Sequence, residues 1–196
     1  MANELQGKKI AILAATGVEQ VELEKPREAV ESAGADTELL SIESGEIQAM
    51  NHDIDKADKI PVDRPVSDAS PVDYDGLILP GGTVNADNLR QDENVISFVQ
   101  EFFRSGKPVG VICHGPWTLV EADLVRGRTL TSYPSIRTDI RNAGGNVVDE
   151  EVVTDQGLVS SRNPDDLPAF CAKIVEEFAE GEHKVHDEGA TARAGA

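Results

Sequence analysis

Apolar and polar positions follow two rhythms along the chain. Three short segments, residues 8–15, 74–82 and 108–113, are apolar with little polar interruption, which is typical of strands buried on both faces of a parallel sheet. Between them apolar residues recur with helical spacing, most clearly in 93–106. Strands that alternate with helices predict a three-layer α/β sandwich, in which a mostly parallel sheet carries helices on both faces.

The same reading predicts the remaining elements. Residues 18–34 form a helix that Gly34 closes, and Pro26 should kink or restart it because proline lacks the backbone N–H. Residues 46–70 are irregular and polar, with short hairpin strands as the candidate elements. The other predictions are a strand at 36–42, a helix after Cys113, a strand, turn and helix in 129–145, two strands in 146–162 with a turn at 155–157, and a helix over 164–181 capped by Asn163 or Asp165.

The 196 residues, 39% of them hydrophobic, suffice for one domain with its own core, which we place at residues 1–181. Residues 182–196 offer few apolar side chains to bury and are expected to be disordered. The chain begins without the apolar stretch of a signal peptide, and no run approaches membrane-spanning length. We therefore expect a cytoplasmic protein.

The charge of the chain limits its possible partners, and its cysteine content indicates free thiols. The formal net charge is -18, from 36 acidic and 18 basic residues, and such a surface repels phosphate backbones and anionic membranes. This argues against nucleic-acid and membrane partners, while solubility and adaptation to high salt explain the acidity equally well.

Two cysteines, Cys113 and Cys171, do not make a disulfide framework and are expected to be free thiols. Cys171 falls on the apolar side of the last predicted helix and is assigned to the core.

Cys113 stands where the fourth buried strand turns into a helix. Open parallel sheets bind ligands beyond the carboxyl ends of their strands, and a tight turn there projects a nucleophile. The N-terminal N–H groups of the helix should lower the pKa of the thiol and favour the reactive thiolate. Gly115 lets the backbone pass close by. A lone cysteine is as often a small buried hydrophobe, but His114 and the Gly-Pro pair that follow it favour a functional thiol.

A glycine pair supports this site. Gly81 and Gly82 end the strand in "LILPGG", and their uncovered N–H groups suit an oxyanion or a carboxylate. No third glycine follows at the spacing of a dinucleotide-binding loop, which excludes a nucleotide cofactor. His183 and His186 are interpreted as solvated tail residues rather than metal ligands, because no scaffold of acids and histidines surrounds them. No metal or organic cofactor is expected.

Four segments together resemble the PfpI intracellular-protease family, within the class I glutamine-amidotransferase-like superfamily. They are "LILPGG", "GKPVGVICHGPWTL", "GRTLTSYPSIRTDIRNAG" and "VSSRNPDDLPAF". The similarity runs from about Lys8 to Ala179, and the general stress proteins and protein deglycases of the family are the most similar. It implies a flavodoxin-like sandwich and a cytoplasmic cysteine hydrolase that acts on peptides or on glyoxal-derived adducts.

The resemblance also implies roles for single residues. Cys113 corresponds to the nucleophile and His114 to the adjacent base. Glu19 corresponds to a protonated carboxyl that hydrogen-bonds the sulfur. Asp87, in a loop one residue longer than the family pattern, corresponds to an acid that reaches the histidine of a neighbouring subunit, which implies a homo-oligomer (dimer or hexamer). Tyr133 lies in a block that the family places near the pocket.

Three functions were compared. In the leading one, the Cys113 thiolate attacks an amide or aldehyde carbonyl, and main-chain N–H groups of Gly82 and His114 hold the oxyanion. In the alternative, the chain is a redox sensor or chaperone-like stress protein without turnover, in which Cys113 is oxidised to a sulfinate that Glu19 stabilises. A glutamine-amidotransferase role needs a histidine and a glutamate late in the chain, separated by one residue, and the segment "SSRNPDDLPAF" has neither.

Overall fold

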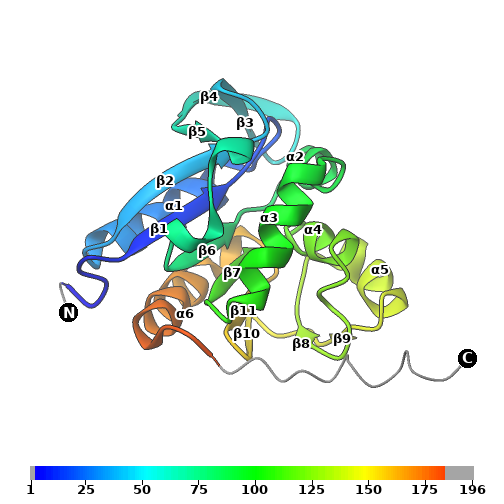
Figure 1. Cartoon of the computed structure of the whole chain (residues 1–196). Helices are drawn as coiled ribbons and strands as arrows, with labels where there is room; N and C mark the ends of the chain where they lie inside the picture. Colours follow the sequence, from blue (N-terminus) through cyan, green and yellow to red (C-terminus); the bar gives the residue numbers. More distant parts are fainter. Residues whose placement is uncertain (1–2, 184–196) are drawn as a thin grey trace, which may run out of the picture.

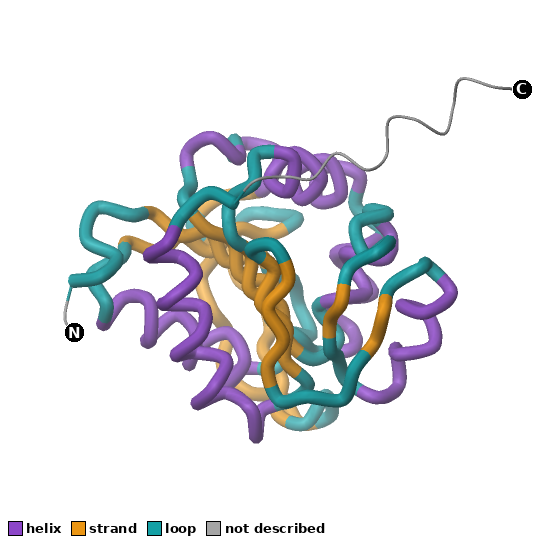
Figure 2. The backbone as a smooth tube through the Cα atoms, turned by 90° about the horizontal axis from the view of Figure 1, so that it is seen from below, coloured by secondary structure: helices purple, strands orange, loops and turns teal. Residues whose placement is uncertain are grey.

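A seven-stranded sheet lies between two layers of helices in the computed structural model, which describes residues 3–183 (Figures 1 and 2). The strand order is β10-β11-β7-β6-β1-β2-β5, and every neighbouring pair is parallel except β10 with β11. This confirms the predicted α/β sandwich. The strands are β1 (Lys9–Leu13), β2 (Asp36–Ser41), β5 (Arg64–Pro65), β6 (Gly76–Leu79), β7 (Val109–Ile112), β10 (Val152–Asp155) and β11 (Leu158–Ser161).

Each face of the sheet has its own helices. On one face lie α1 (Gln20–Ser32) and α6 (Leu167–Glu180), which pack on each other as well as on the strands. The other face carries α2 (Thr83–Arg90), α3 (Glu93–Arg104), α4 (Pro116–Glu121) and α5 (Arg137–Asn142). The packing of strand β1 explains why its sequence is apolar throughout. Ile10 and Ile12 point toward the face that carries α1 and α6, and Ala11 and Leu13 point toward the opposite face.

Local sequence explains how these layers come together. Helix α3 is capped by Asp92, whose carboxylate accepts hydrogen bonds from the N–H groups of Asn94 and Val95. Its apolar stripe of valines and phenylalanines then packs on the sheet. In β7, Gly110 lets α6 come close, because a Cβ at this position would lie 2.7 Å from Ile174 Cγ2. Packing therefore explains a glycine in the middle of a central strand.

The structure differs from three local predictions. Residues 46–70 contain a long hairpin, β3 (Gly45–Asn51) and β4 (Asp55–Val62), whose strands have seven and eight residues. Helix α1 continues through Pro26 without a restart. Asn163 caps the short 3-10 helix Pro164–Asp166 that precedes α6, and it does not cap α6 itself. Helix α2 was not predicted at all, because only Ala86 and Leu89 among its buried residues are apolar.

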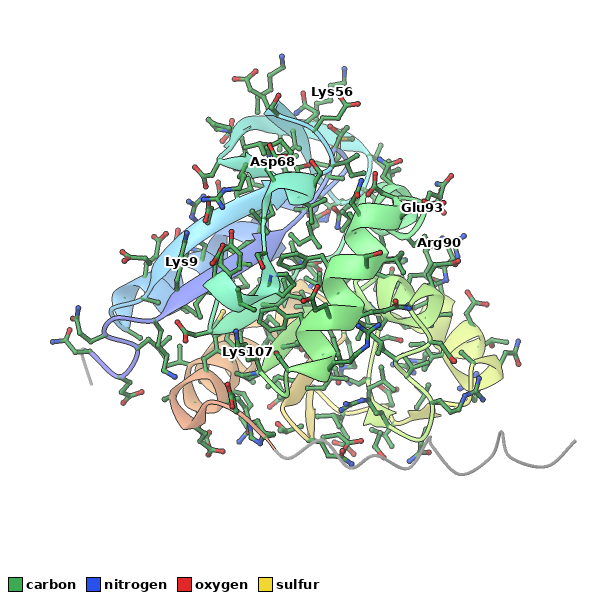
Figure 3. The ribbon with its side chains drawn as sticks, in the orientation of Figure 1. Lys9, Lys56, Asp68, Arg90, Glu93 and Lys107 are labelled. Atoms are coloured by element: carbon green, nitrogen blue, oxygen red, sulfur yellow. The ribbon has the colours of Figure 1, made fainter. Side chains whose placement is uncertain are left out.

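The remaining short elements connect these layers. They are the two-stranded sheet of β8 (Thr129–Leu130) and β9 (Asn146–Val147) and the 3-10 helices Val66–Asp68, Pro71–Asp73 and Pro134–Ile136. Charged side chains project from the outer surface, as the labelled residues of Figure 3 show. Across the part of the chain that the structure describes, no helix combines the length and apolar character needed to cross a membrane. Most of the predicted tail, 184–196 with His186, lies outside the described residues.

Candidate active site

The ends of three neighbouring strands surround a cavity of about 450 Å³. Strands β1, β6 and β7 are adjacent and parallel, so the segments that follow them meet at one edge of the sheet. The hairpin tip between β3 and β4 and the 3-10 helix before α6 complete the wall. The lining residues are Glu19, Glu22, His52, Asp53, Gly82, Cys113, Tyr133, Asn163, Pro164 and Asp165.

Cys113 is the turning point between β7 and α4. Its φ of +61° lies in the left-handed region, which a side-chain-bearing residue adopts rarely and mainly at functional turns. Its N–H donates to the Ser161 carbonyl at 3.1 Å, which ties the turn to the neighbouring strand β11. The backbone N–H groups of Gly82 and His114 face the sulfur. The structure thus brings the predicted nucleophile and the predicted oxyanion donors together.

The predicted lowering of the Cys113 pKa was wrong. The residue is only 6% exposed, and burial raises the pKa of its thiol well above the ordinary value. The Glu22 carboxyl raises this pKa further when it is ionised, while the N–H groups of Gly82 and His114 lower it. Burial is the largest of these effects, so the resting sulfur is a thiol that needs a base.

The acid beside the sulfur is Glu22, not Glu19 as the family resemblance implied. Glu22 is fully buried in the first turn of α1, and its carboxyl contacts Cys113. Neither of its oxygens has a partner at hydrogen-bond geometry among residues 3–183. Burial raises the pKa of Glu22 to about 8, so the carboxyl beside the sulfur holds a proton at neutral pH.

Glu19 has a different set of contacts. It lies one residue before α1, at the wall of the same cavity. Its carboxylate accepts hydrogen bonds from the N–H groups of His52 and Asp53, at 2.9 and 3.0 Å. Glu19 therefore holds the hairpin tip against the cavity, three residues before the acid that touches the sulfur.

His114 uses both ring nitrogens. Nδ1 lies 3.2 Å from the sulfur of Cys113, while Nε2 lies 3.0 Å from Ser135 Oγ and 3.3 Å from Thr83 Oγ1. The ring stacks on Tyr133, with 4.6 Å between the centroids, and Tyr133 is 39% exposed at the mouth of the cavity. Burial lowers the pKa of His114, and the charge of Asp53 opposes that shift. The imidazole is thereby kept neutral, as a base requires.

Besides Glu22, sequence reasoning missed the three polar residues that surround His114 Nε2. Asp53 comes from the hairpin tip, Thr83 from the start of α2 and Ser135 from the 3-10 helix after Tyr133. Asp53 accepts hydrogen bonds from both the N–H and the hydroxyl of Thr83, at 2.7 and 2.9 Å. No sequence motif marked these residues. Asp53 in particular lies in a polar stretch without periodicity, far from Cys113 along the chain.

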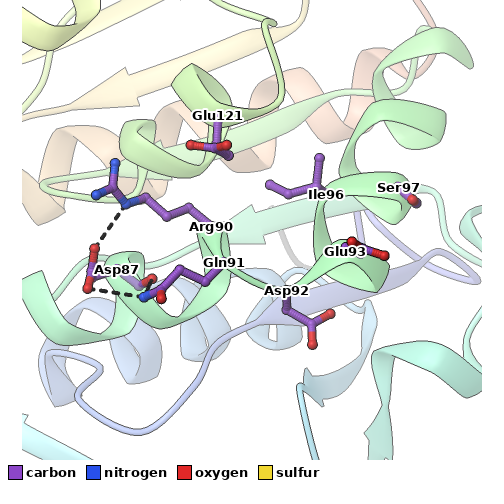
Figure 4. A pocket seen from close by; sticks show the side chains of 8 residues that line it. All are labelled: Asp87, Arg90, Gln91, Asp92, Glu93, Ile96, Ser97 and Glu121. Atoms are coloured by element: carbon purple, nitrogen blue, oxygen red, sulfur yellow. Dashed lines mark hydrogen bonds and ion pairs between the residues drawn. The ribbon is translucent and has the colours of Figure 1, made fainter.

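Asp87 does not reach His114 within one chain. It accepts hydrogen bonds from the side chains of Arg90 and Gln91 on α2 (Figure 4). With these residues it lines a second, open cavity of about 950 Å³ that also includes Glu93 and Glu121. Any contact of Asp87 with an imidazole requires a second copy of the chain.

The predicted glycines have different roles. Gly82 lines the cavity, and Gly81 backs it: a Cβ on Gly81 would overlap Glu22 Oε2 and lie 2.6 Å from Cys113 Cβ. Gly115, also expected to bind substrate, faces away from the cavity. Its N–H donates to the Ile112 carbonyl at 2.9 Å, and a Cβ would lie 2.7 Å from the Leu79 carbonyl oxygen. Gly115 is thus a packing residue behind the turn.

We predict that Gly82→Ala weakens both the fold and the site. Gly82 has a φ of +96°, and a Cβ would collide with the Gly17 carbonyl oxygen. The displaced loop should cost about 1–3 kcal/mol of unfolding free energy and remove the N–H that faces the sulfur. Gly127→Ala is the matched control, since Gly127 also has a positive φ, +74°, but nothing lies within 4 Å of its Cβ position. Urea unfolding of both variants measures the difference, and equal losses would contradict the prediction.

The other predicted residues lie outside this site. Cys171 is half-buried on α6, where it packs against the core from its edge and lines a groove shared with Lys25 of α1. His183 was interpreted as a solvated tail residue, but its N–H donates to the Gly106 carbonyl at 2.8 Å. Its Nε2 lies 3.2 Å from Glu177 Oε2 on α6. Together with Glu180, these two side chains place three potential metal-ligand atoms within 4.8 Å of one another.

Comparison with known proteins places this geometry in context. Residues 8–177 match the DJ-1/PfpI family. An uncharacterized protein of Staphylococcus haemolyticus is 42% identical over 173 residues, which cover 87% of this chain and 98% of that protein. The Bacillus subtilis protein "Putative cysteine protease YraA" is 40% identical over 163 residues, with 83% and 94% coverage. A solved two-domain protein of Anabaena variabilis contains DJ-1/ThiJ/PfpI-like and ferritin-like domains. It superposes with a TM-score of 0.81 and 34% sequence identity, and the alignment covers 86% of this chain and 47% of the Anabaena chain.

Proposed function

Because the chain belongs to the DJ-1/PfpI family, we propose that it is a cysteine-dependent hydrolase acting inside the cell on peptides or on glyoxal-derived carbonyl adducts. One observation carries the proposal: the sulfur of Cys113 lies 3.2 Å from Nδ1 of a neutral imidazole. This pair sits at a cavity wall where backbone N–H groups converge. Nucleophile, base and oxyanion donors are the parts that acyl transfer requires.

The proposed reaction begins with a proton transfer. The thiol proton of Cys113 moves to His114 Nδ1 as the sulfur forms a bond to the carbonyl carbon of the substrate. The carbonyl π electrons move onto the oxygen, and the N–H groups of Gly82 and His114 stabilise the resulting oxyanion. For an amide, the imidazolium then returns its proton to the leaving amine as the C–N bond breaks. Water hydrolyses the thioester that remains.

The cavity favours a small substrate. Its volume of about 450 Å³ suits a single side chain or a methylglyoxal adduct better than an extended peptide. Four carboxyl groups, those of Glu19, Glu22, Asp53 and Asp165, line it without a lysine or arginine among the lining residues. We therefore place neutral and amine-bearing carbonyl compounds ahead of anionic ones.

A substrate panel tests the proposal. Purified protein is incubated with methylglyoxal, a methylglyoxal-modified peptide and casein, and steady-state product formation is measured for each. We expect turnover of at least one, with kcat/KM higher for the two small carbonyl substrates than for casein. Failure to turn over any of the three would contradict the enzymatic proposal.

The alternative of a redox sensor is supported by the contact between Glu22 and the sulfur. A protonated carboxyl at this position could donate a hydrogen bond to a sulfinate oxygen. Under mild peroxide a sensor would gain two oxygen atoms on Cys113, which intact-protein mass spectrometry detects. Such a gain, combined with no turnover in the panel, would favour the sensor over the hydrolase.

We also propose that the chain forms a homo-oligomer in which Asp87 of one copy approaches His114 of another. The support is the exposure of Asp87 in the open α2 cavity, where a second copy has access to it. Analytical ultracentrifugation should show a dimer or larger assembly, and activity per chain should fall as the protein is diluted below the dissociation constant. A monomer with full activity would remove Asp87 from the mechanism.

A further inference from the structure

We infer that Asp53 is a positioning residue for His114 and acts through the hydroxyl of Thr83. The inference rests on the proposed role of His114 as the base. Three segments distant in sequence carry it: the tip of the β3–β4 hairpin, the first residue of α2 and the turn after β7. Nothing in the sequence motifs of the site anticipates this link.

The hydrogen bonds of Thr83 select one tautomer of His114. Asp53 accepts from the Thr83 N–H at 2.7 Å and from its hydroxyl at 2.9 Å. The hydroxyl has a single proton, so once Asp53 holds it, Thr83 Oγ1 offers only lone pairs to His114 Nε2, 3.3 Å away. Nε2 must then carry the hydrogen. The lone pair is left on Nδ1, which faces the sulfur of Cys113 at 3.2 Å.

Asp53 also stabilises the charged state that follows proton transfer. When His114 Nδ1 takes the thiol proton, the buried ring becomes an imidazolium, and burial opposes that charge. The Asp53 carboxylate raises the pKa of His114 against this effect. Asp53 therefore acts on the orientation of the ring and on its basicity through Thr83 and through its charge.

Glu19 holds Asp53 in place. Both hairpin-tip residues, His52 and Asp53, have left-handed φ angles of +55° and +62°. Residues with side chains adopt this conformation rarely, so the tip needs support. The Glu19 carboxylate supplies it by accepting the N–H groups of both residues. The Met50 N–H also donates to the Val18 carbonyl at 2.8 Å, which fixes the hairpin along this segment.

Other groups around the imidazole do not select the tautomer. Ser135 Oγ lies 3.0 Å from Nε2, but its exposed hydroxyl can rotate to donate or to accept. Tyr133 presents its ring face. The titratable and charged groups of the same cavity in the described chain are Cys113, Glu22, Glu19, His52, Asp53, Tyr133 and Asp165. Arg90 and Asp139 also lie near, since both contact Trp117, the aromatic neighbour of His114.

The test uses Asp53→Asn and nuclear magnetic resonance of His114, assigned by loss of its signals in His114→Gln. An asparagine amide donates to Thr83 Oγ1 and turns the hydroxyl proton toward Nε2, which favours the tautomer with Nδ1 protonated. We expect ¹⁵N-detected spectra to show Nε2–H in the wild type and a shift toward Nδ1–H in the variant, with a lower pKa of His114. The rate of Cys113 alkylation by iodoacetamide at pH 7 should fall about 10²-fold, because the base is lost.

Matched variants separate positioning from folding. Thr83→Val, which has nearly the same shape without the hydroxyl, should behave like Asp53→Asn, and Thr83→Ser should behave like the wild type. In the double variant Asp53→Asn/Thr83→Val, Cys113 alkylation should be no slower than in the slower single variant, because the two substitutions break the same link. Asp55→Asn makes the same charge change two residues along the hairpin and should leave the His114 titration unchanged.

Two outcomes overturn the inference. One is an unchanged tautomer and pKa of His114 in both Asp53→Asn and Thr83→Val. The other is a change caused by Asp87→Asn and not by Asp53→Asn, which would assign the role to a neighbouring copy. Tautomer, titration and alkylation are all measured without substrate. A failure of the proposed hydrolase activity is therefore distinguishable from a failure of this positioning role.

Discussion

Replacing Cys113 with serine should lower kcat/KM for any substrate of this protein by at least about 10³-fold. A serine hydroxyl has a much higher pKa than a thiol and is a poorer nucleophile, so proton transfer to His114 no longer generates an effective attacking atom. The fold should survive, since serine is slightly smaller and the N–H groups of Gly82 and His114 remain to bind its oxygen. Steady-state assays on the best substrate of the panel measure the loss.

Cys171→Ser is the matched control. It removes the other free thiol of the described chain, which lies half-buried on α6 outside the active-site cavity. Its kcat/KM should stay within about twofold of the wild type, as expected for a residue that contacts no reacting group. If Cys113→Ser retained most of the activity, or if Cys171→Ser lost it, the sulfur of Cys113 would not be the nucleophile.

The Glu22→Gln variant should become more stable relative to the wild type as the pH rises. The pKa of Glu22 is about 8 in the folded chain, against an ordinary value of 4.5, so the folded state binds this proton more tightly than the unfolded state. Its contribution to stability is complete below pH 4.5 and is lost as the pH rises through about 8. The loss is roughly 1.4 kcal/mol per pH unit between these values, a few kcal/mol in all. A glutamine side chain does not titrate in this range, so the unfolding free energy of the variant lacks this pH-dependent loss.

Urea unfolding at several pH values between 5 and 8.5 measures this effect. The difference in unfolding free energy between Glu22→Gln and the wild type should increase across the range. Glu121→Gln, the same chemical change at an exposed position of α4, should show a difference that stays nearly constant. A constant difference for Glu22→Gln as well would mean that the Glu22 carboxyl is ionised in the folded protein at neutral pH.

The predictions that succeeded depend on short-range patterns. The apolar segments at 8–15, 74–82 and 108–113 predicted the central strands β1, β6 and β7, because a strand covered on both faces has no polar side to show. The same logic placed Cys113 at the strand–helix turn and the glycine pair at the end of β6. Adjacent parallel strands then bring these two loops together, so both could be assigned to one site from the order of elements.

The acid beside the sulfur illustrates where such reasoning ends. Glu19 and Glu22 are three residues apart, and sequence alone does not say which of them faces Cys113. Helix α1 begins at Gln20, so Glu22 lies within its first turn and points into the sheet, while Glu19 remains outside and turns toward the hairpin. The choice depends on where the helix starts and how it packs.

Sequence by itself determined the sandwich, the positions of its buried strands along the chain and the position of the nucleophile, because each follows from periodicity or from residues adjacent in the chain. Tertiary structure decided the protonation of Cys113 and Glu22 and the link from Asp53 through Thr83 to His114. Protonation depends on burial, and burial is a property of the whole packed chain. The link joins side chains dozens of residues apart, whose meeting depends on how the hairpin docks on the sheet edge.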